Sequence, residues 1–206
     1  MTHAVVYDVE FLTAPGAPQR FWCGPMDPDP VVVQIGAVML DLEDGFDIHT
    51  PFDKLVQPVD RFGAPITLDP LLTRLTGIDD VRIAAEGAAL ANALDAFAAY
   101  GAGARFWAWG KDEFNMMAIS CYVAGIAPPL PAMRFGNACT LMLAAGVPLE
   151  EIHKTRSPTV PQLLGLPDPG LTAHDALSDA RSVALGLQAL LRSGRLDPAL
   201  LRPHGS

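Results

Sequence analysis

Four carboxylates and one histidine, spread over three stretches of the chain, are the residues best suited to chemistry. Asp8 and Glu10 stand two apart in a short apolar stretch near the N-terminus. Because side chains alternate along a strand, this spacing puts both carboxylates on one face. Two carboxylates on an apolar strand are costly unless something pairs them, and a divalent cation is a suitable partner. A solvated outer face is the alternative, and for this pair taken alone it is the commoner outcome.

His174 and Asp179 form a second group near the end of the chain. If Asp175 caps a helix, His174 lies in the preceding loop and can reach over the first turn, where Asp179 projects. That arrangement suits a base in a loop beside a metal ligand held on a helix. The alternative is an ordinary loop histidine and an acid that only complements the helix dipole.

A third group, Asp112 and Glu113, stands at the expected start of a helix. Acids in a first helical turn are common for electrostatic reasons, so either one alone means little. Their combination with the other two groups matters more, because the edge of a strand and the starts of two helices can converge in an α/β domain.

The elements that must position these residues follow from the residue patterns. Alternating and β-branched stretches predict strands at residues 5–12, 31–42, 47–58 and 105–109. Apolar residues at helical spacing predict helices at residues 71–77, 83–97, 114–125, 137–146, 159–164 and 175–191. The helix at 114–125 is apolar on two sides, which predicts a buried helix. Three strands followed by alternating helices and strands indicate one α/β domain over residues 1–192, with a loosely held tail at 193–206.

Composition limits the class of protein. The chain has 206 residues, 50% of them hydrophobic, which excludes disorder for most of its length. No apolar stretch is long enough to span a membrane, and no secretory signal is visible, so we expect a cytoplasmic protein with no membrane partner. The three cysteines are odd in number and form no Cys-x-x-Cys pair, which argues against a disulfide framework or a zinc site. A net charge of −9 argues against a broad nucleic-acid-binding surface.

In this order the motifs resemble the DEDD family of 3′→5′ exonucleases, which is named after four scattered acids. The matching segments are VYDVEF, VVQIGAV, LTGIDDV, FWAWGKDEFNMM and HDALSDARSVA. A histidine five residues before the last acid is similar to the DEDDh branch, which includes ribonuclease T-like and proofreading exonucleases. The resemblance implies a ribonuclease H-like α/β fold with a central mixed five-stranded sheet, three antiparallel strands and then parallel ones, flanked by helices.

The same resemblance implies the site. Asp8, Glu10, Asp179 and an acid at position 112 or 113 would hold two Mg²⁺ or Mn²⁺ ions, and His174 would be the general base. For the disputed position, the family pattern of an Asp favours Asp112. Helical phase slightly favours Glu113, which lies about 40° from Met117 around the helix. We expect Asp112 to be the ligand and keep Glu113 as the alternative.

The implied substrate is the 3′ end of single-stranded or short RNA or DNA, released as nucleoside 5′-monophosphates. Gln34 and Phe11 are expected to line the nucleotide pocket, with Phe11 stacking on the terminal base; core packing of Phe11 is an equal alternative. The basic residues at 153–156 are interpreted as a solvated loop, with a phosphate contact as the second reading. The Pro- and Gly-rich residues 13–30 either fold over the site or pack on the surface.

Two other functions remain open at this point. A phosphodiesterase acting on dinucleotides or other small nucleotides would suit the negative charge. A non-catalytic nucleic-acid-binding module on the same fold would have lost its chemistry. Many members of this superfamily are dimers, so the resemblance also leaves a homodimer open.

Overall fold

Five strands form one sheet, in the order β3-β2-β1-β4-β5. The computed structural model describes residues 2–203. The strands are β1 (His3–Phe11), β2 (Val32–Asp41), β3 (Ile48–Leu55), β4 (Phe106–Ala108) and β5 (Phe135–Asn137). Strands β1, β2 and β3 pair antiparallel, whereas β4 runs parallel to β1 and β5 runs parallel to β4. The expected mixed five-stranded sheet is confirmed.

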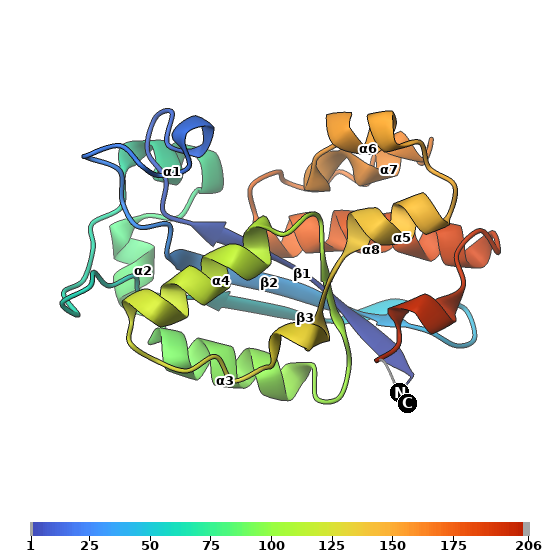
Figure 1. The fold of residues 1–206 in the computed structure, drawn as a ribbon, viewed down its shortest axis with the longest axis horizontal. Helices are drawn as coiled ribbons and strands as arrows, with labels where there is room; N and C mark the ends of the chain where they lie inside the picture. The colour runs from blue at the N-terminus through green and yellow to red at the C-terminus, as the bar shows by residue number, and fades with distance from the viewer. Residues whose placement is uncertain (1, 204–206) are drawn as a thin grey trace.

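The described residues also form helices, which are labelled in chain order in Figure 1. They are α1 (Pro70–Thr76), α2 (Asp80–Glu86), α3 (Leu90–Tyr100), α4 (Asp112–Val123), α5 (Ala138–Ala144), α6 (Leu149–Lys154), α7 (Val160–Leu163) and α8 (Ala176–Arg192). Short 3₁₀ turns occur at Pro18–Arg20, Ala132–Arg134, Ser157–Thr159 and Pro198–Leu201. None of these helices is long and apolar enough to cross a membrane.

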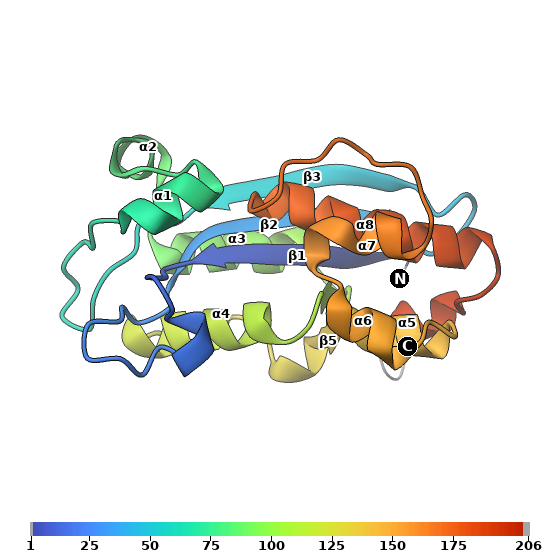
Figure 2. The same ribbon diagram turned by 90° about the horizontal axis from the view of Figure 1, so that it is seen from above.

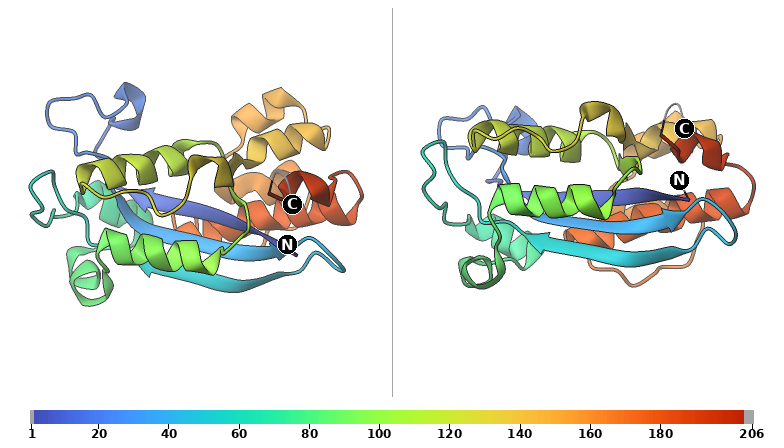
Figure 3. Two further views of the ribbon diagram at one scale, coloured as in Figure 1. Left: turned by 60° about the horizontal axis from the view of Figure 1, so that its bottom comes forward. Right: turned by 90° about the horizontal axis from the view of Figure 1, so that it is seen from below.

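Helices cover both faces of the sheet, α8 on one face and α3 with α4 on the other (Figure 2 and Figure 3). The alternation of β1 decides which side chains meet which helices. Val6 packs in the apolar cluster that includes α8, and Tyr7 packs in the cluster that includes α3 and α4. Asp8 and Glu10 have the same parity as Val6, so β1 directs both carboxylates toward the α8 side.

The helix predicted over residues 83–97 is instead two helices, α2 and α3, and that prediction was wrong. The chain between them leaves the helical path to extend the sheet next to β3. The Ala88 N–H donates to Leu55 O, and the Gln57 N–H donates to Ala88 O, both at 2.9 Å. Apolar residues continue in phase across this break, so periodicity alone did not reveal it.

The segment after α8 is packed, contrary to the expectation of a loosely held tail. Leu196 and Leu201 are buried in the cluster that α8 forms with the sheet. The Trp107 indole N–H donates to Leu201 O at 3.3 Å. These contacts tie the chain down as far as residue 201.

Helix α4 is buried on one side only, so the expectation of an all-round buried helix was also wrong. Its buried residues recur at helical spacing and include Glu113, Met116, Met117, Ser120 and Cys121. Tyr122, on the opposite side, is almost fully exposed. The buried stripe carries Glu113 inward with it.

Candidate active site

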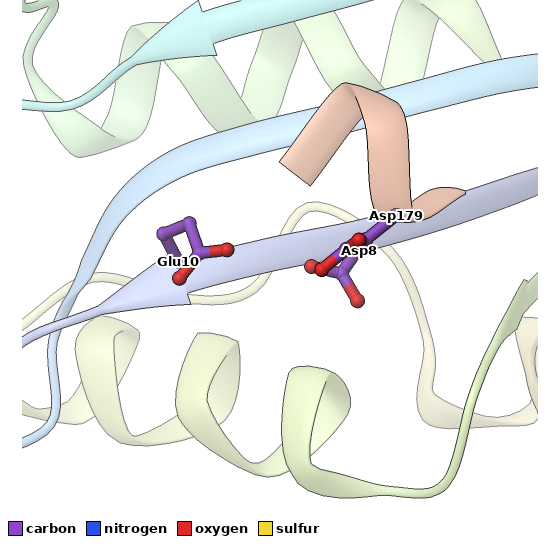
Figure 4. Close-up of side chains that lie close together, drawn as sticks. All are labelled: Asp8, Glu10 and Asp179. Carbon is purple, nitrogen blue, oxygen red and sulfur yellow. The ribbon is translucent and has the colours of Figure 1, made fainter. Parts of the chain in front are cut away.

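Three carboxylates converge beside the sheet, two from β1 and one from the first turn of α8. Oxygen atoms of Asp8, Glu10 and Asp179 all lie within 4.8 Å of one another. Figure 4 shows Asp8 and Asp179 next to each other, with Glu10 two residues further along β1. Asp8 and Asp179 are buried, and Glu10 is partly buried. The structure therefore brings together acids that are about 170 residues apart in the chain.

A glycine in β2 allows α8 to approach this closely. Gly36 pairs with Asp8 in the β1–β2 ladder. A Cβ atom at position 36 would overlap the backbone of Ala176 and Leu177 in the first turn of α8. Asp175 caps this helix by accepting a hydrogen bond from the Ser178 N–H at 3.0 Å, as the sequence predicted.

Glu113, and not Asp112, is the second-motif acid that faces Asp8. Glu113 is buried and lies close enough to Asp8 that each carboxyl group influences the pKa of the other. Asp112 lines the same cavity but is exposed at its rim. Position 113, and not position 112, lies on the buried stripe of α4, so this placement favours Glu113, the alternative that the helical phase offered, over Asp112.

Burial and crowding raise the pKa values of the whole cluster. Burial raises the pKa of Glu10 to about 8, and the Asp179 carboxylate adds to the effect. Burial likewise raises the pKa of Glu113 to about 8 and that of Asp179 to about 6. The pKa of Asp8 lies well above its usual range through burial and the nearby Glu113. Without a cation these carboxylates cannot all be ionised near neutral pH.

Two carboxylate oxygens of the cluster have no partner within the described residues. Glu113 Oε2 and Asp179 Oδ1 are buried and make no hydrogen bond. A buried carboxylate oxygen without a partner is costly. Hard divalent cations take carboxylate oxygens as ligands, so the donor set and its two orphaned oxygens fit a site for such ions.

His174 lies at the edge of this cluster, held there by its backbone. Its N–H donates to Asp179 Oδ2 at 3.3 Å, and its φ of 60° places it in the left-handed region. The side chain is exposed, lines the cavity, and has no hydrogen-bond partner among residues 2–203. The Ser157 hydroxyl lies beside Asp179 and partly offsets the rise in the pKa of that carboxyl. No sequence pattern indicated Ser157, which begins the 3₁₀ turn Ser157–Thr159.

The acids line a cavity of about 740 Å³, large enough for a ligand of drug or nucleotide size. The segment that follows β1 contributes Pro18 at one end, and helix α6 contributes Ile152 and His153 at the other (Figure 1). Of residues 13–30, Pro18 therefore borders the site. Phe11 also lines the cavity, and its ring packs edge-on against Trp22 with centroids 5.6 Å apart.

Gln34 does not line the cavity, and the expectation that it does is corrected. Its side chain is buried and fully engaged inside the fold. The amide nitrogen donates to Asp53 and Asp175 at 3.0 Å, and the amide oxygen accepts from the Ala176 N–H at 3.1 Å. Gln34 therefore joins β2 and β3 to the start of α8 and supports the site from behind.

Comparison with known proteins gives structural matches only. No protein-family model matches the chain, and no curated protein matches it. A 3′-exonuclease solved for its recognition of the 3′ end of histone mRNA stem-loop is similar, with a TM-score of 0.73 and 16% identity. That match covers 95% of this chain and 84% of the other. A full-length 3′-exonuclease matches with a TM-score of 0.72, 17% identity and the same coverage.

A larger exonuclease contains the same fold as one part of its chain. The zinc-bound complex of E. coli exonuclease I with single-stranded DNA matches with a TM-score of 0.64 and 17% identity. This match covers 97% of this chain and 43% of the E. coli chain. The sheet order, the placement of the acids and these matches lead to one conclusion: the chain has the ribonuclease H-like fold of the 3′-exonucleases.

Proposed function

We propose that this protein is a metal-dependent 3′→5′ exonuclease that removes nucleoside 5′-monophosphates from single-stranded or short RNA or DNA. The observation that carries the proposal is the convergence of Asp8, Glu10, Glu113 and Asp179 beside His174 in one large cavity. The fold shared with 3′-exonucleases supports the same activity.

The four carboxylates would hold two Mg²⁺ or Mn²⁺ ions. Support comes from the orphaned oxygens of Glu113 and Asp179 and from the raised pKa values, which indicate a cluster lacking positive charge. Such ions, when bound, lower the pKa of a water molecule and stabilise negative charge on the phosphoryl oxygens and the leaving oxygen. In this proposal Asp112 is not a metal ligand, because it is exposed at the rim of the cavity.

His174 would act as the general base. Its exposed ring borders the cavity, and its backbone bond to Asp179 keeps the ring near the acids. The water oxygen bonds to phosphorus, and the bond from phosphorus to the 3′ oxygen of the preceding nucleotide breaks. His174 would take one proton from the attacking water, and the leaving 3′ oxygen would accept a proton from solvent water to become a hydroxyl group. Imidazole suits this task because it exchanges protons near neutral pH.

Phe11 would contact the terminal base. It follows Glu10 directly in β1, it lines the cavity of the acids, and Trp22 packs against its ring from the side. Trp22 is itself fixed, because its indole N–H donates to Leu12 O at 3.1 Å. A ring held in this way can stack on any base, so we expect little base preference.

A phosphodiesterase of dinucleotides is the second candidate, and the charge of the protein favours it. The net charge is −9, and long nucleic acids are held mainly through many phosphate contacts. We further propose a reducing, cytoplasmic setting, in which the exposed Cys23 and the other two cysteines stay free thiols. A homodimer stays a proposal to be tested by measuring the mass in solution.

The experiment is incubation with 5′-labelled 20-mers and dinucleotides of RNA and DNA, in Mg²⁺ or Mn²⁺ and in a chelator. The proposal predicts a ladder of products shortened from the 3′ end, only with metal. Cleavage of dinucleotides but not of 20-mers would favour the second candidate. Binding without cleavage of any substrate by folded, metal-supplied protein would indicate a non-catalytic module and defeat the proposal.

A further inference from the structure

The wall of the cavity opposite the segment after β1 carries a positive charge that the proposed chemistry does not use. Five acids line the cavity, and Arg156 is the only arginine or lysine among its described lining residues. Arg156 is exposed and forms no ion pair with any carboxylate in the described chain. An unpaired guanidinium in an acidic cavity is well suited to bind an anion.

The backbone around Arg156 is fixed at three points. The Trp109 indole N–H donates to Thr155 O at 3.3 Å, on one side of Arg156. The Ser182 hydroxyl donates to Ser157 O at 2.7 Å, on the other side. Arg156 itself donates its N–H to the Thr159 hydroxyl at 3.2 Å. The side chain of Arg156 therefore projects from a rigid segment, which lowers the entropy cost of binding a ligand there.

The side chains of positions 156 and 157 diverge. The Ser157 hydroxyl lies beside Asp179, in the acidic cluster, where it influences the pKa of that carboxyl. The Arg156 guanidinium points back along α6, where Nη1 donates to Thr155 O at 3.2 Å and to His153 O at 3.5 Å. The Arg156 guanidinium therefore lies on the α6 side of the cavity wall and not above the acidic cluster. A phosphate bound at the acids and a phosphate bound at Arg156 would be two different phosphates.

We propose that Arg156 binds the phosphate next to the reacting one, on the 5′ side of the penultimate nucleotide. This inference rests on the proposed exonuclease activity and names the smallest substrate that uses the whole site. That substrate is a dinucleotide carrying a 5′-phosphate, or any longer strand. A bare dinucleotide offers only the reacting phosphate and leaves Arg156 without a ligand.

Lys154 provides a matched control. It is a cation two residues away, but it pairs with Glu151 at 3.1 Å and lines a separate cavity beyond α6. Arg156→Gln and Lys154→Gln remove the same charge from the same short segment. Only Arg156→Gln should change the preference of the enzyme for a dinucleotide that carries a 5′-phosphate.

The test compares kcat and KM for one dinucleotide with and without a 5′-phosphate, in Mg²⁺ or Mn²⁺. The wild-type protein should prefer the phosphorylated form by about tenfold or more, mainly through KM. Arg156→Gln should bring this ratio close to one. Arg156→Lys should keep part of the preference, and Lys154→Gln all of it.

Two results would overturn the inference, and they differ from each other. If the wild-type protein cleaves both dinucleotides but Arg156→Gln keeps the wild-type ratio, Arg156 only caps the end of α6. In that case the variant would show a lower melting temperature and nothing else. If the wild-type protein cleaves neither substrate with metal present, the proposed function fails and this inference fails with it.

Discussion

Gly36 and Asp8 are direct partners across the β1–β2 ladder, and this pairing sets the distance between the two halves of the acidic cluster. The missing side chain of Gly36 lets the first turn of α8 lie against the sheet. Asp179 is carried on that turn and so reaches Asp8. The cluster depends on a residue that has no functional group of its own.

Replacing Gly36 with Ala should therefore damage the site from behind. The added methyl group overlaps the backbone of α8, so the helix must move, at a cost of about 1–3 kcal/mol. We expect weaker divalent-metal binding and a lower melting temperature. Titration calorimetry with Mn²⁺ and thermal unfolding measure the two effects.

The neighbouring change Ala37→Gly is the control for this experiment. Ala37 packs on the opposite face of the sheet, in the cluster with α3 and α4. The substitution Ala37→Gly should lower the free energy of unfolding by about 1 kcal/mol without moving α8. Metal binding should therefore persist. Equal loss of metal affinity in both variants would refute the role assigned to Gly36.

Glu113→Gln should be far more damaging than Asp112→Asn. Glu113 is buried against Asp8, whereas Asp112 is exposed at the rim. Loss of a metal ligand should lower activity by at least about 100-fold, and Asp112→Asn should change it only a few-fold. Steady-state rates on one labelled oligonucleotide decide between them, and the reverse order would restore the assignment first made from the sequence.

Removal of the imidazole should affect turnover rather than metal binding. His174→Ala is expected to lower kcat by about 10²–10⁴-fold, the usual contribution of a general base. Its backbone bond to Asp179 does not need the side chain, so Mn²⁺ affinity should stay close to that of the wild-type protein. Wild-type activity in a folded His174→Ala protein would eliminate the proposed base.

The stability of the metal-free protein should fall as the pH rises from about 4.5 to about 8. Folding raises the pKa of Glu10 and of Glu113 from 4.5 to about 8. Between these values the folded state binds more protons than the unfolded state, so raising the pH favours unfolding. Above about pH 8 no further loss comes from these two groups.

Thermal unfolding in a chelator, at several values of pH, measures this effect. Glu113→Gln removes one of the two groups, so its melting temperature should fall less steeply with pH than that of the wild type. Mg²⁺ should stabilise the wild-type protein most near pH 8, where the carboxylates are ionised. Identical pH profiles for the two proteins would mean that Glu113 is not buried as described.

The sequence was enough to predict that β1 carries two carboxylates on one face and that α8 begins at Asp175 with His174 before it. Strand alternation and helix capping are local rules, and both elements obey them. The sheet type followed from the resemblance. The residue pattern did not predict strand β5, because its three residues, Phe-Gly-Asn, are too few to show alternation.

The errors have a common origin in contacts between distant segments. Gln34 looked like a pocket residue, but bonds to Asp53 and Asp175 hold it inside the fold. Asp112 matched the expected residue type, but packing of α4 on the sheet turned Glu113 inward. Leu201 was expected to belong to a loose tail, but it is buried in the cluster between α8 and the sheet. Of these contacts, only the inward turn of Glu113 leaves a local pattern in the sequence, the helical phase that it shares with Met117.

The most direct test of the central claim follows the label at the 3′ end. A strand with a labelled 3′-terminal nucleotide is incubated with wild-type protein and with Asp8→Asn, in Mg²⁺ or Mn²⁺ and in a chelator. We predict that the first labelled product is the nucleoside 5′-monophosphate, formed only by the wild-type protein and only with metal. Label released in the chelator, released by Asp8→Asn at the wild-type rate, or released as a longer fragment would contradict the account.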